Sequence, residues 1–304
     1  RWDGELYADF PKVDVTRLRA YLDLSRWGVV VQSGAGSLRA WVALARGETT
    51  GVTADLDLRA VDVQLGSGLA PLQLETVSGR LDAQWSDDSL TLEGDALQFR
   101  TLEGETWPQS QLRFTQRADG PNQPHSVAFT ADRFDLGTLS ALATRLPLPS
   151  ATRDLLDSLQ PTGWASDLSL NWQGQPGAAT STSGGIDGLQ GRYRAKGRVV
   201  DLALARRPHE KTSNATEGLF PGRPGIAGAK VDFDLNEQGG HARLTVAQGA
   251  MELPGVFEDP LLPLTSLEAN ATWRLQGERI EVALDQLRLA NADIKGNGQR
   301  RWHT

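Results

Sequence analysis

The sequence predicts a mainly β fold: a long, curled antiparallel sheet of successive hairpins that forms an open hydrophobic groove, with a short helical pair inserted. Three observations predict this class. Apolar and polar residues alternate over many segments, and pairs of these segments flank turns rich in Gly, Asp, Asn and Pro. Several alternations also slip by one residue near their middle, as a β-bulge requires.

The segment from Gly51 to Leu65 shows this slip most clearly. Its apolar residues occupy even positions up to Leu58 and odd positions from Val61 onwards. A bulge explains the change, because one extra residue keeps the same face apolar on both sides and bends the strand. Comparable slips are expected within residues 90–99, 127–136, 280–289 and, more weakly, 197–204, with Asp95, Asp132 and Asp285 close to three of them.

Hairpins are expected wherever two alternating segments flank a short turn, because antiparallel strands need only a tight connection. The predicted hairpins join residues 38–45 to 51–65, 77–85 to 90–99, 111–116 to 127–136, 229–235 to 241–248, and 267–275 to 280–289. Their turns recur at an approximate interval along the chain, which is typical of a structural array.

Three segments interrupt this rhythm. Residues 136–161 have leucines at helical spacing, and Pro147 and Pro149 divide them into two short helices, the second with Ser150 as its N-cap. Residues 173–190 and 205–228 are rich in Gly, Pro, Ser and Thr and are predicted to be flexible loops. We therefore expect residues 1–304 to be a fragment of one continuous β-groove domain with a helical insertion.

The bulk composition excludes several classes of protein. The 304 residues carry a net charge of −7 and include no cysteine. Without a basic patch, a nucleic-acid partner is not expected. The sequence has no apolar stretch long enough for a transmembrane helix. It starts without Met and stops after a strand-like run, so we expect an excised interior piece of a longer protein.

Catalytic or metal-binding chemistry is not predicted. The four histidines, His125, His209, His241 and His303, show no metal-ligand spacing and are interpreted as solvated surface residues. The carboxylate pairs Asp55/Asp57 and Asp232/Asp234 have the two-residue spacing of a strand's polar face. No catalytic residue, metal site or cofactor follows from the sequence, and no enzyme is expected.

Three of the nine tryptophans occupy matching positions. Trp85, Trp172 and Trp273 each close an alternating strand just before a turn, in phase with its apolar side. They are predicted either to form the rim of an apolar groove or to seal the sheet edge against water. Stacking on sugars would need tryptophan on the polar face, which this phase does not favour.

The apolar side of such a sheet needs a cover. Either the sheet closes on itself as a sandwich or barrel, or it curls into a trough whose lining stays partly open. An open lining would suit a long, apolar ligand. The residues predicted to line it are Leu38, Ala40, Val42, Leu44, Val52, Ala54, Leu56, Leu58, Leu81, Ala83, Val231, Phe233, Leu235, Leu244, Val246, Ile280, Val282 and Leu284.

Several long segments resemble one known family. The stretches LRAWVALARGETTGVTADLDLRAVDVQL, LSALATRLPLPSATRDLLDSLQPTGWASDLSLNWQG and MELPGVFEDPLLPLTSLEANATWRLQGERIEVALDQLRLANADIKGNG are similar to the YhdP family of AsmA-like proteins. The resemblance implies a large protein of Gram-negative bacteria, anchored in the inner membrane and crossing the periplasm. It implies a repeating β-groove that moves phospholipids between inner and outer membranes, contributing to outer membrane homeostasis, without catalytic residues.

The leading hypothesis is therefore a segment of a bridge-like lipid transfer protein in the periplasm. Its expected partners are phospholipid acyl chains, the other segments of the same long chain, and inner- and outer-membrane factors at the ends of the full-length protein. One alternative is a structural or adhesive β-array with a self-filled core and no lipid. Another is a carbohydrate-binding or carbohydrate-processing β protein, which only the tryptophan count favours.

Overall fold

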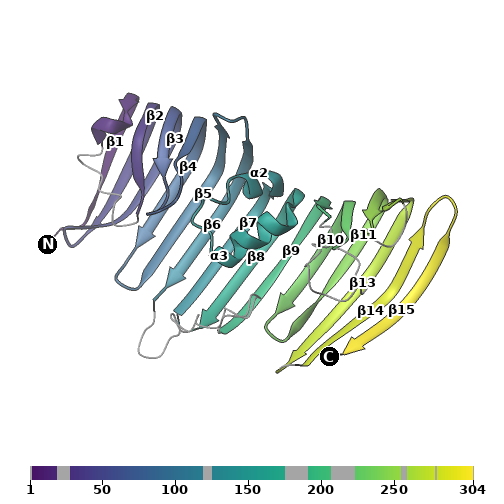
Figure 1. Ribbon diagram of the computed structural model, residues 1–304. Coiled ribbons are helices and arrows are strands. Elements are labelled where there is room, and N and C mark those ends of the chain that lie inside the picture. The colour runs from purple at the N-terminus through teal and green to yellow at the C-terminus, as the bar shows by residue number, and fades with distance from the viewer. Residues whose placement is uncertain are drawn as a thin grey trace, which may run out of the picture. The chain divides into compact units, whose positions relative to one another are not determined.

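The predicted mainly β fold is confirmed. A computed structural model describes residues 2–18, 28–118, 125–174, 191–206, 223–254, 259–277 and 279–303. These residues form fifteen strands and three short helices (Figure 1): β1 (Gly4–Asp14), α1 (Val15–Leu18), β2 (Val30–Ala45), β3 (Glu48–Gln64), β4 (Leu72–Trp85), β5 (Ser89–Thr101), β6 (Thr106–Arg117), β7 (His125–Asp135), α2 (Leu136–Ala141), α3 (Ser150–Leu159), β8 (Thr162–Gly174), β9 (Gly191–Leu204), β10 (Gly225–Asn236), β11 (Gly239–Glu252), β12 (Leu261–Leu264), β13 (Ser266–Gln276), β14 (Arg279–Ala290) and β15 (Lys295–His303).

The sheet follows the order of the chain. Each strand is hydrogen-bonded to the next one in sequence, except that β12 lies off this path and pairs with β11, which also pairs with β13. The order begins at β1 and ends at β15, so the sheet is open rather than closed on itself. The chain divides into two compact units, which we call unit 1 (Arg1–Asp154 and Leu168–Arg192) and unit 2 (Leu155–Asp167 and Tyr193–Thr304).

All five predicted hairpins are present as antiparallel pairs: β2 with β3, β4 with β5, β6 with β7, β10 with β11, and β13 with β14. The strands extend beyond the predicted segments at several ends. Three strands were not predicted: β1, β12 and β15. β15 contains two glycines and no alternating apolar residues, so its sequence gives no strand signal.

The predicted bulges are also present. In four strands the bulge contains a non-glycine residue in the left-handed region, with φ of 50° at Ala60, 51° at Ala96, 54° at Asp201 and 56° at Gln286. The pairing register shifts beside each of them. Left-handed backbone inside a strand bends it and restores the apolar phase on the same face.

The slip in β7 is built differently. Here the Asp132 carboxylate accepts hydrogen bonds from the main-chain N–H groups of Gln111, at 2.7 Å, and of Arg133, at 2.6 Å. The main-chain ladder between β6 and β7 ends at the pair Leu112 and Ala131. Beyond this pair, the Asp132 carboxylate accepts the hydrogen bond from β6 in place of a main-chain carbonyl. The irregularity predicted at Asp132 thus depends on its carboxylate.

The helical insertion is shorter than its leucine spacing predicts. The helix α2 starts after Asp135, whose carboxylate caps it by accepting a hydrogen bond from the Thr138 N–H at 2.6 Å. It ends at Ala141, so Leu142 and Leu146 follow the helix rather than belong to it. Ser150 is the first residue of α3.

The two predicted loops lie mostly outside the described residues. Where residues 173–190 are described, Gln173 and Gly174 complete β8, and where residues 205–228 are described, Gly225 begins β10. Within the described part of the chain, no helix combines the length and the apolar character needed to cross a membrane.

Candidate functional site

One continuous apolar row crosses seven strands of unit 1, from β1 to β7. Residues directly opposite each other in an antiparallel pair share a face of the sheet. By this criterion one face carries, side by side, Leu6, Val42, Val52, Ala83, Leu92, Phe114 and Phe129. We call these residues the long row. None of the seven is buried, and Leu6 and Leu92 are 57% and 41% exposed.

A second row runs beside the long row on the same face. It pairs Ala8 with Ala40, Ala40 with Ala54, and Ala54 with Leu81. Leu81 is 40% exposed, and the three alanines are half-buried. The long row and these four residues together form what we call the open track. It is an apolar surface made of alanine, valine, leucine and phenylalanine side chains.

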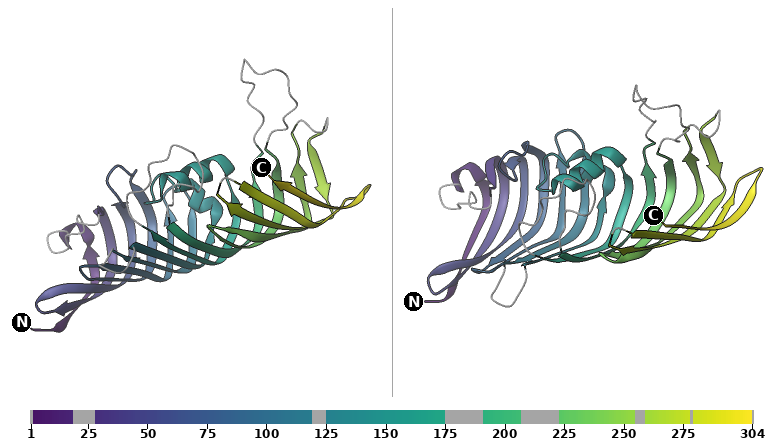
Figure 2. Two further views of the ribbon diagram at one scale, coloured as in Figure 1. Left: turned by 90° about the horizontal axis from the view of Figure 1, so that it is seen from below. Right: turned by 60° about the horizontal axis from the view of Figure 1, so that its bottom comes forward.

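The same face is sealed beyond the bulges. Val61, Val63, Leu72 and Leu74 are each less than 10% exposed and form one core cluster with Leu142, which is completely buried. Leu146 packs against this cluster, and the Ala70 N–H donates a hydrogen bond to the Thr144 carbonyl oxygen at 3.4 Å. The insertion therefore supplies a second layer over β3 and β4, on the face toward which the strands curve (Figure 2).

An aromatic stack continues this covered region across β5, β6 and β7. Trp107 lies between Phe99 and Phe134, with ring centroids 5.6 and 5.8 Å away. Its indole N–H donates to the Ser110 hydroxyl at 2.9 Å, and the side chain is only 7% exposed. Sequence reasoning missed Trp107. Trp107 and Ser110 are three residues apart, and the pairing with β5 shifts register between them, so a period of two does not connect them.

Unit 2 repeats the division into an open and a buried part. Val231, Phe233 and Leu235 pair with Leu244, Ala242 and Gly240, and the three β10 side chains are half-buried. Next to these residues, the buried residues Ala229, Val246, Leu264 and Leu267 form a separate core cluster.

The predicted lining residues thus fall into two groups. Leu58 and Val246 are buried within the core clusters, with 9% and 2% of their surfaces exposed. Leu81 and Ile280 are exposed, and the other predicted lining residues are half-buried. Contact between these side chains and a lipid stays a prediction.

The three predicted rim tryptophans are half-buried residues at strand ends. Trp85 pairs with Leu90, and Trp273 pairs with Val282, which places both on the apolar side. Trp172 meets the His125 ring edge-on, with centroids 5.7 Å apart. Their half-burial suits a rim or a seal equally, so this choice stays a prediction.

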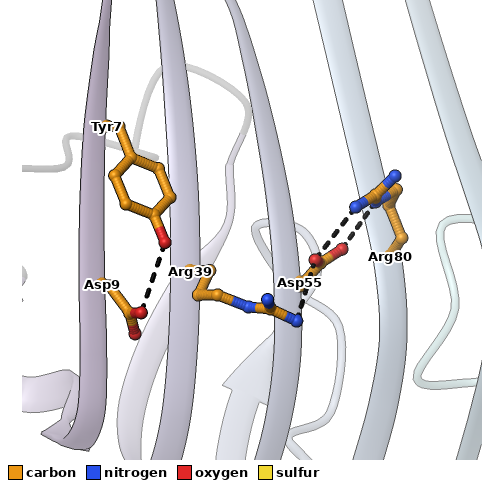
Figure 3. A network of polar contacts seen from close by, with 5 residues as sticks. All are labelled: Tyr7, Asp9, Arg39, Asp55 and Arg80. Atoms are coloured by element: carbon orange, nitrogen blue, oxygen red, sulfur yellow. Dashed lines mark hydrogen bonds and ion pairs between the residues drawn. The ribbon is translucent and has the colours of Figure 1, made fainter.

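The opposite face of unit 1 is polar and carries charges of alternating sign. Asp9, Arg39, Asp55, Arg80 and Asp95 are cross-strand neighbours on β1 to β5. Arg80 donates two hydrogen bonds to Asp55, at 2.5 and 2.9 Å, and the Arg39 guanidinium lies 3.4 Å from the same carboxylate (Figure 3). The hydrogen bond from Arg80 holds the pKa of Asp55 below its ordinary value.

Trp41 also lies on this polar face, since it pairs with Tyr7 and Thr53. The Tyr7 ring is 5.2 Å from the Trp41 ring, and the Arg80 guanidinium lies 5.6 Å from its centroid. The residues that contact Trp41 therefore belong to the sheet itself. This arrangement does not favour a free stacking platform for sugars.

The polar face of unit 2 has the same design. Arg198 pairs with Asp232 at 2.5 Å, and Arg194 pairs with Asp234 at 2.6 Å and lowers the pKa of that carboxylate. These pairs confirm that the Asp doublets belong to a polar strand face. Two open hollows of about 760 Å³ each lie along this face, lined by ion-paired residues such as Asp234 together with His241. Their charge makes them unsuited to hydrocarbon.

Three of the four histidines lie in the part of the chain that the structure describes. His125 begins β7 and is half-buried, whereas His241 and His303 are exposed, and His209 lies outside the described residues. Among the described residues, no group of three or more His, Asp or Glu side chains could hold a metal ion.

Comparison with known proteins gives one match. A family model described as "YhdP protein" matches residues 1–304. No curated protein and no solved structure matches the chain.

Proposed function

Because the chain belongs to the YhdP family, we propose that it is a segment of a conduit that carries phospholipids across the periplasm between the inner and outer membranes. Membership of this AsmA-like family indicates lipid transport rather than catalysis. The phospholipid cargo, the two membranes, the periplasmic location and an inner-membrane anchor on the full-length protein are parts of the proposal.

The open track is the observation that carries this proposal. Its long row offers seven consecutive apolar side chains without one polar interruption. Seven strands at a spacing of about 4.8 Å give a row about 29 Å long, running across the strands. A contiguous exposed apolar surface of this kind marks a binding site in proteins.

Transport along this surface would be passive. Each methylene group that leaves water for the apolar wall contributes about 0.8 kcal/mol. Aliphatic and aromatic walls make no directional bonds with the chain, so the acyl chain can slide while its head group stays in water beside the open track.

The first test is the identification of bound lipid. Native mass spectrometry of the gently purified chain should show phospholipid, because its acyl chains would cover the open track. Protein that is consistently lipid-free after purification without detergent would favour the alternative, a structural or adhesive array with a self-filled core. The core cluster around Leu142 is what favours that alternative.

A charge in the long row should stop binding without unfolding the sheet. Val42→Asp places a carboxylate among Val52 and Leu6, where hydrocarbon would otherwise rest. The matched control is Ala43→Asp, one residue further on and on the polar face. Val42→Asp should lose the co-purifying phospholipid and retain its circular dichroism spectrum, and Ala43→Asp should keep both. Loss of the β spectrum in Val42→Asp would instead indicate a closed, packed core.

A further inference from the structure

The strand β15 places a cation on the apolar face of unit 2. Its pairing with β14 sets Trp302 beside Val282 and Arg300 beside Leu284. Leu284 continues an apolar row, since it pairs with Ala271, which pairs in turn with Ala242 and then Phe233. Arg300 therefore stands at the β15 end of a row whose other members on these strands are all apolar.

Among the described residues, this guanidinium has no neutralising partner. The strand arginines Arg194 and Arg198 are paired with aspartates on the opposite, polar face. The Arg300 side chain forms no ion pair and no hydrogen bond with any described residue, and its guanidinium lies 5.8 Å from the centroid of the Trp302 ring. The Trp302 side chain is 45% exposed. Its ring orients the Arg300 guanidinium but accepts no hydrogen bond from the guanidinium N–H groups.

We infer that Arg300 binds the phosphate group of a lipid whose acyl chain lies against Val282 and Leu284. This inference rests on the proposed function and adds to it a contact for the head group. A guanidinium presents a planar fork of donors that matches phosphate oxygens. Trp302 suits a position between the acyl chain and the phosphate group, because an indole combines an apolar ring with a polar N–H.

The test compares three probes by isothermal titration calorimetry with the complete chain, at concentrations below micelle formation. Dodecyl phosphate combines the acyl-like chain with the anion, dodecyl maltoside has the same chain with a neutral head group, and inorganic phosphate has the anion alone. The test variant is Arg300→Gln. Its control is Arg301→Gln, which removes the adjacent arginine that pairs with Ala283 on the polar face.

Arg300→Gln should weaken the binding of dodecyl phosphate about tenfold, the order expected for a charged hydrogen-bonded pair, and leave dodecyl maltoside unchanged. Arg301→Gln should bind both amphiphiles like the wild-type chain. Inorganic phosphate should bind far more weakly than dodecyl phosphate, because it gains nothing from the apolar wall.

Three results would overturn the inference. The first is an unchanged dodecyl phosphate affinity in Arg300→Gln while dodecyl maltoside still binds, which would leave the proposed function standing. The second is an equal loss in Arg301→Gln, which would indicate a general charge effect. The third is Arg300-dependent binding of inorganic phosphate as tight as that of dodecyl phosphate, which would indicate a free-phosphate site. Failure of both amphiphiles to bind the wild-type chain would count against the proposed function itself.

Discussion

At the scale of single residues, two of the bulges face a glycine in the neighbouring strand. Gly79 of β4 faces the bulge at Ala96, and a Cβ added to Gly79 would lie 2.8 Å from the Leu97 Cα and 2.9 Å from the Ala96 oxygen. Its φ of 139° is also unfavourable for any other residue. Gly163 has the same relation to the bulge at Asp201. These two bends therefore require a glycine in the neighbouring strand as well as a bulged residue.

Gly79→Ala should therefore destabilise the sheet by about 1–3 kcal/mol, from backbone strain and the clash with β5. Gly296→Ala is the control, because Gly296 lies in a strand with nothing within 4 Å of the added Cβ. Urea unfolding followed by circular dichroism measures both variants. Equal stability of the two variants would show that β4 and β5 can separate at the bulge without cost.

The ion pairs of the polar face should make stability depend on pH. The pKa of Asp55 is lowered in the folded chain, so its contribution is complete above the unfolded value of about 3.9 and is lost as the pH falls through the folded value. Asp55→Asn should thus flatten the fall in unfolding free energy as the pH drops from about 5 to about 2.

The control for this experiment is Asp57→Asn, on the same strand and the same face. Asp57 forms no ion pair within the described residues, so its variant should follow the wild-type pH dependence closely. Urea titrations at each pH provide the comparison. If Asp55→Asn retained the full acid sensitivity, Arg80 and Arg39 would contribute nothing to stability through Asp55.

At the scale of elements, the insertion after β7 decides how much of the apolar face stays open. The segment that follows α2 lies on β3 and β4, where Leu142 completes a core with residues some 70–80 positions earlier in the chain. Arg145 fixes its far end by a two-pronged ion pair with Glu103, which also lowers the pKa of that glutamate. The insertion is a fixed second layer in this structure.

Leu142→Ala should therefore destabilise unit 1 by about 3 kcal/mol, because it opens a cavity in a completely buried site. Leu102→Ala removes the same atoms from a side chain that is 63% exposed and should cost less than about 0.5 kcal/mol. Urea unfolding measures both. A small effect of Leu142→Ala would mean that the second layer detaches readily from β3 and β4.

At the scale of the whole molecule, the two faces of the sheet have separate tasks. One face holds the strands together through rows of ion pairs, and the other presents apolar rows that are open in one part and buried in core clusters in another. The proposed lipid could therefore reach only the open part. This division makes the position of a side chain on the sheet decisive for contact with lipid.

Site-specific photo-crosslinking can map this division. A benzoylphenylalanine placed at Val52 or Phe129, in the long row, should crosslink to phospholipid from phosphatidylethanolamine–phosphatidylglycerol vesicles. The same group at Thr53, on the polar face, should give no lipid adduct. Adducts of equal yield at Thr53 and Val52 would contradict a track confined to the apolar face. Circular dichroism serves as the control that identifies variants that fail to fold.

The sequence by itself determined the hairpins, the bulges and the assignment of an apolar and a polar face. These are local properties: a period of two sets the face, a slip marks the bulge at Ala60 or Gln286, and the turn residues set the pairing. Cross-strand neighbours in consecutive hairpins follow from these local rules, so most of the open track could be predicted.

The tertiary structure alone decided which part of the apolar face is covered and that the Arg300 side chain lies on this face. The cover depends on contacts between Leu142 and the distant β3–β4 region, and alternation within a strand contains no information about such a partner. Arg300 reaches the apolar face through the register of a glycine-rich strand beside a bulge in β14. Local periodicity fixes the direction of a side chain, but only the packing of distant segments determines whether that side chain meets protein, water or a ligand.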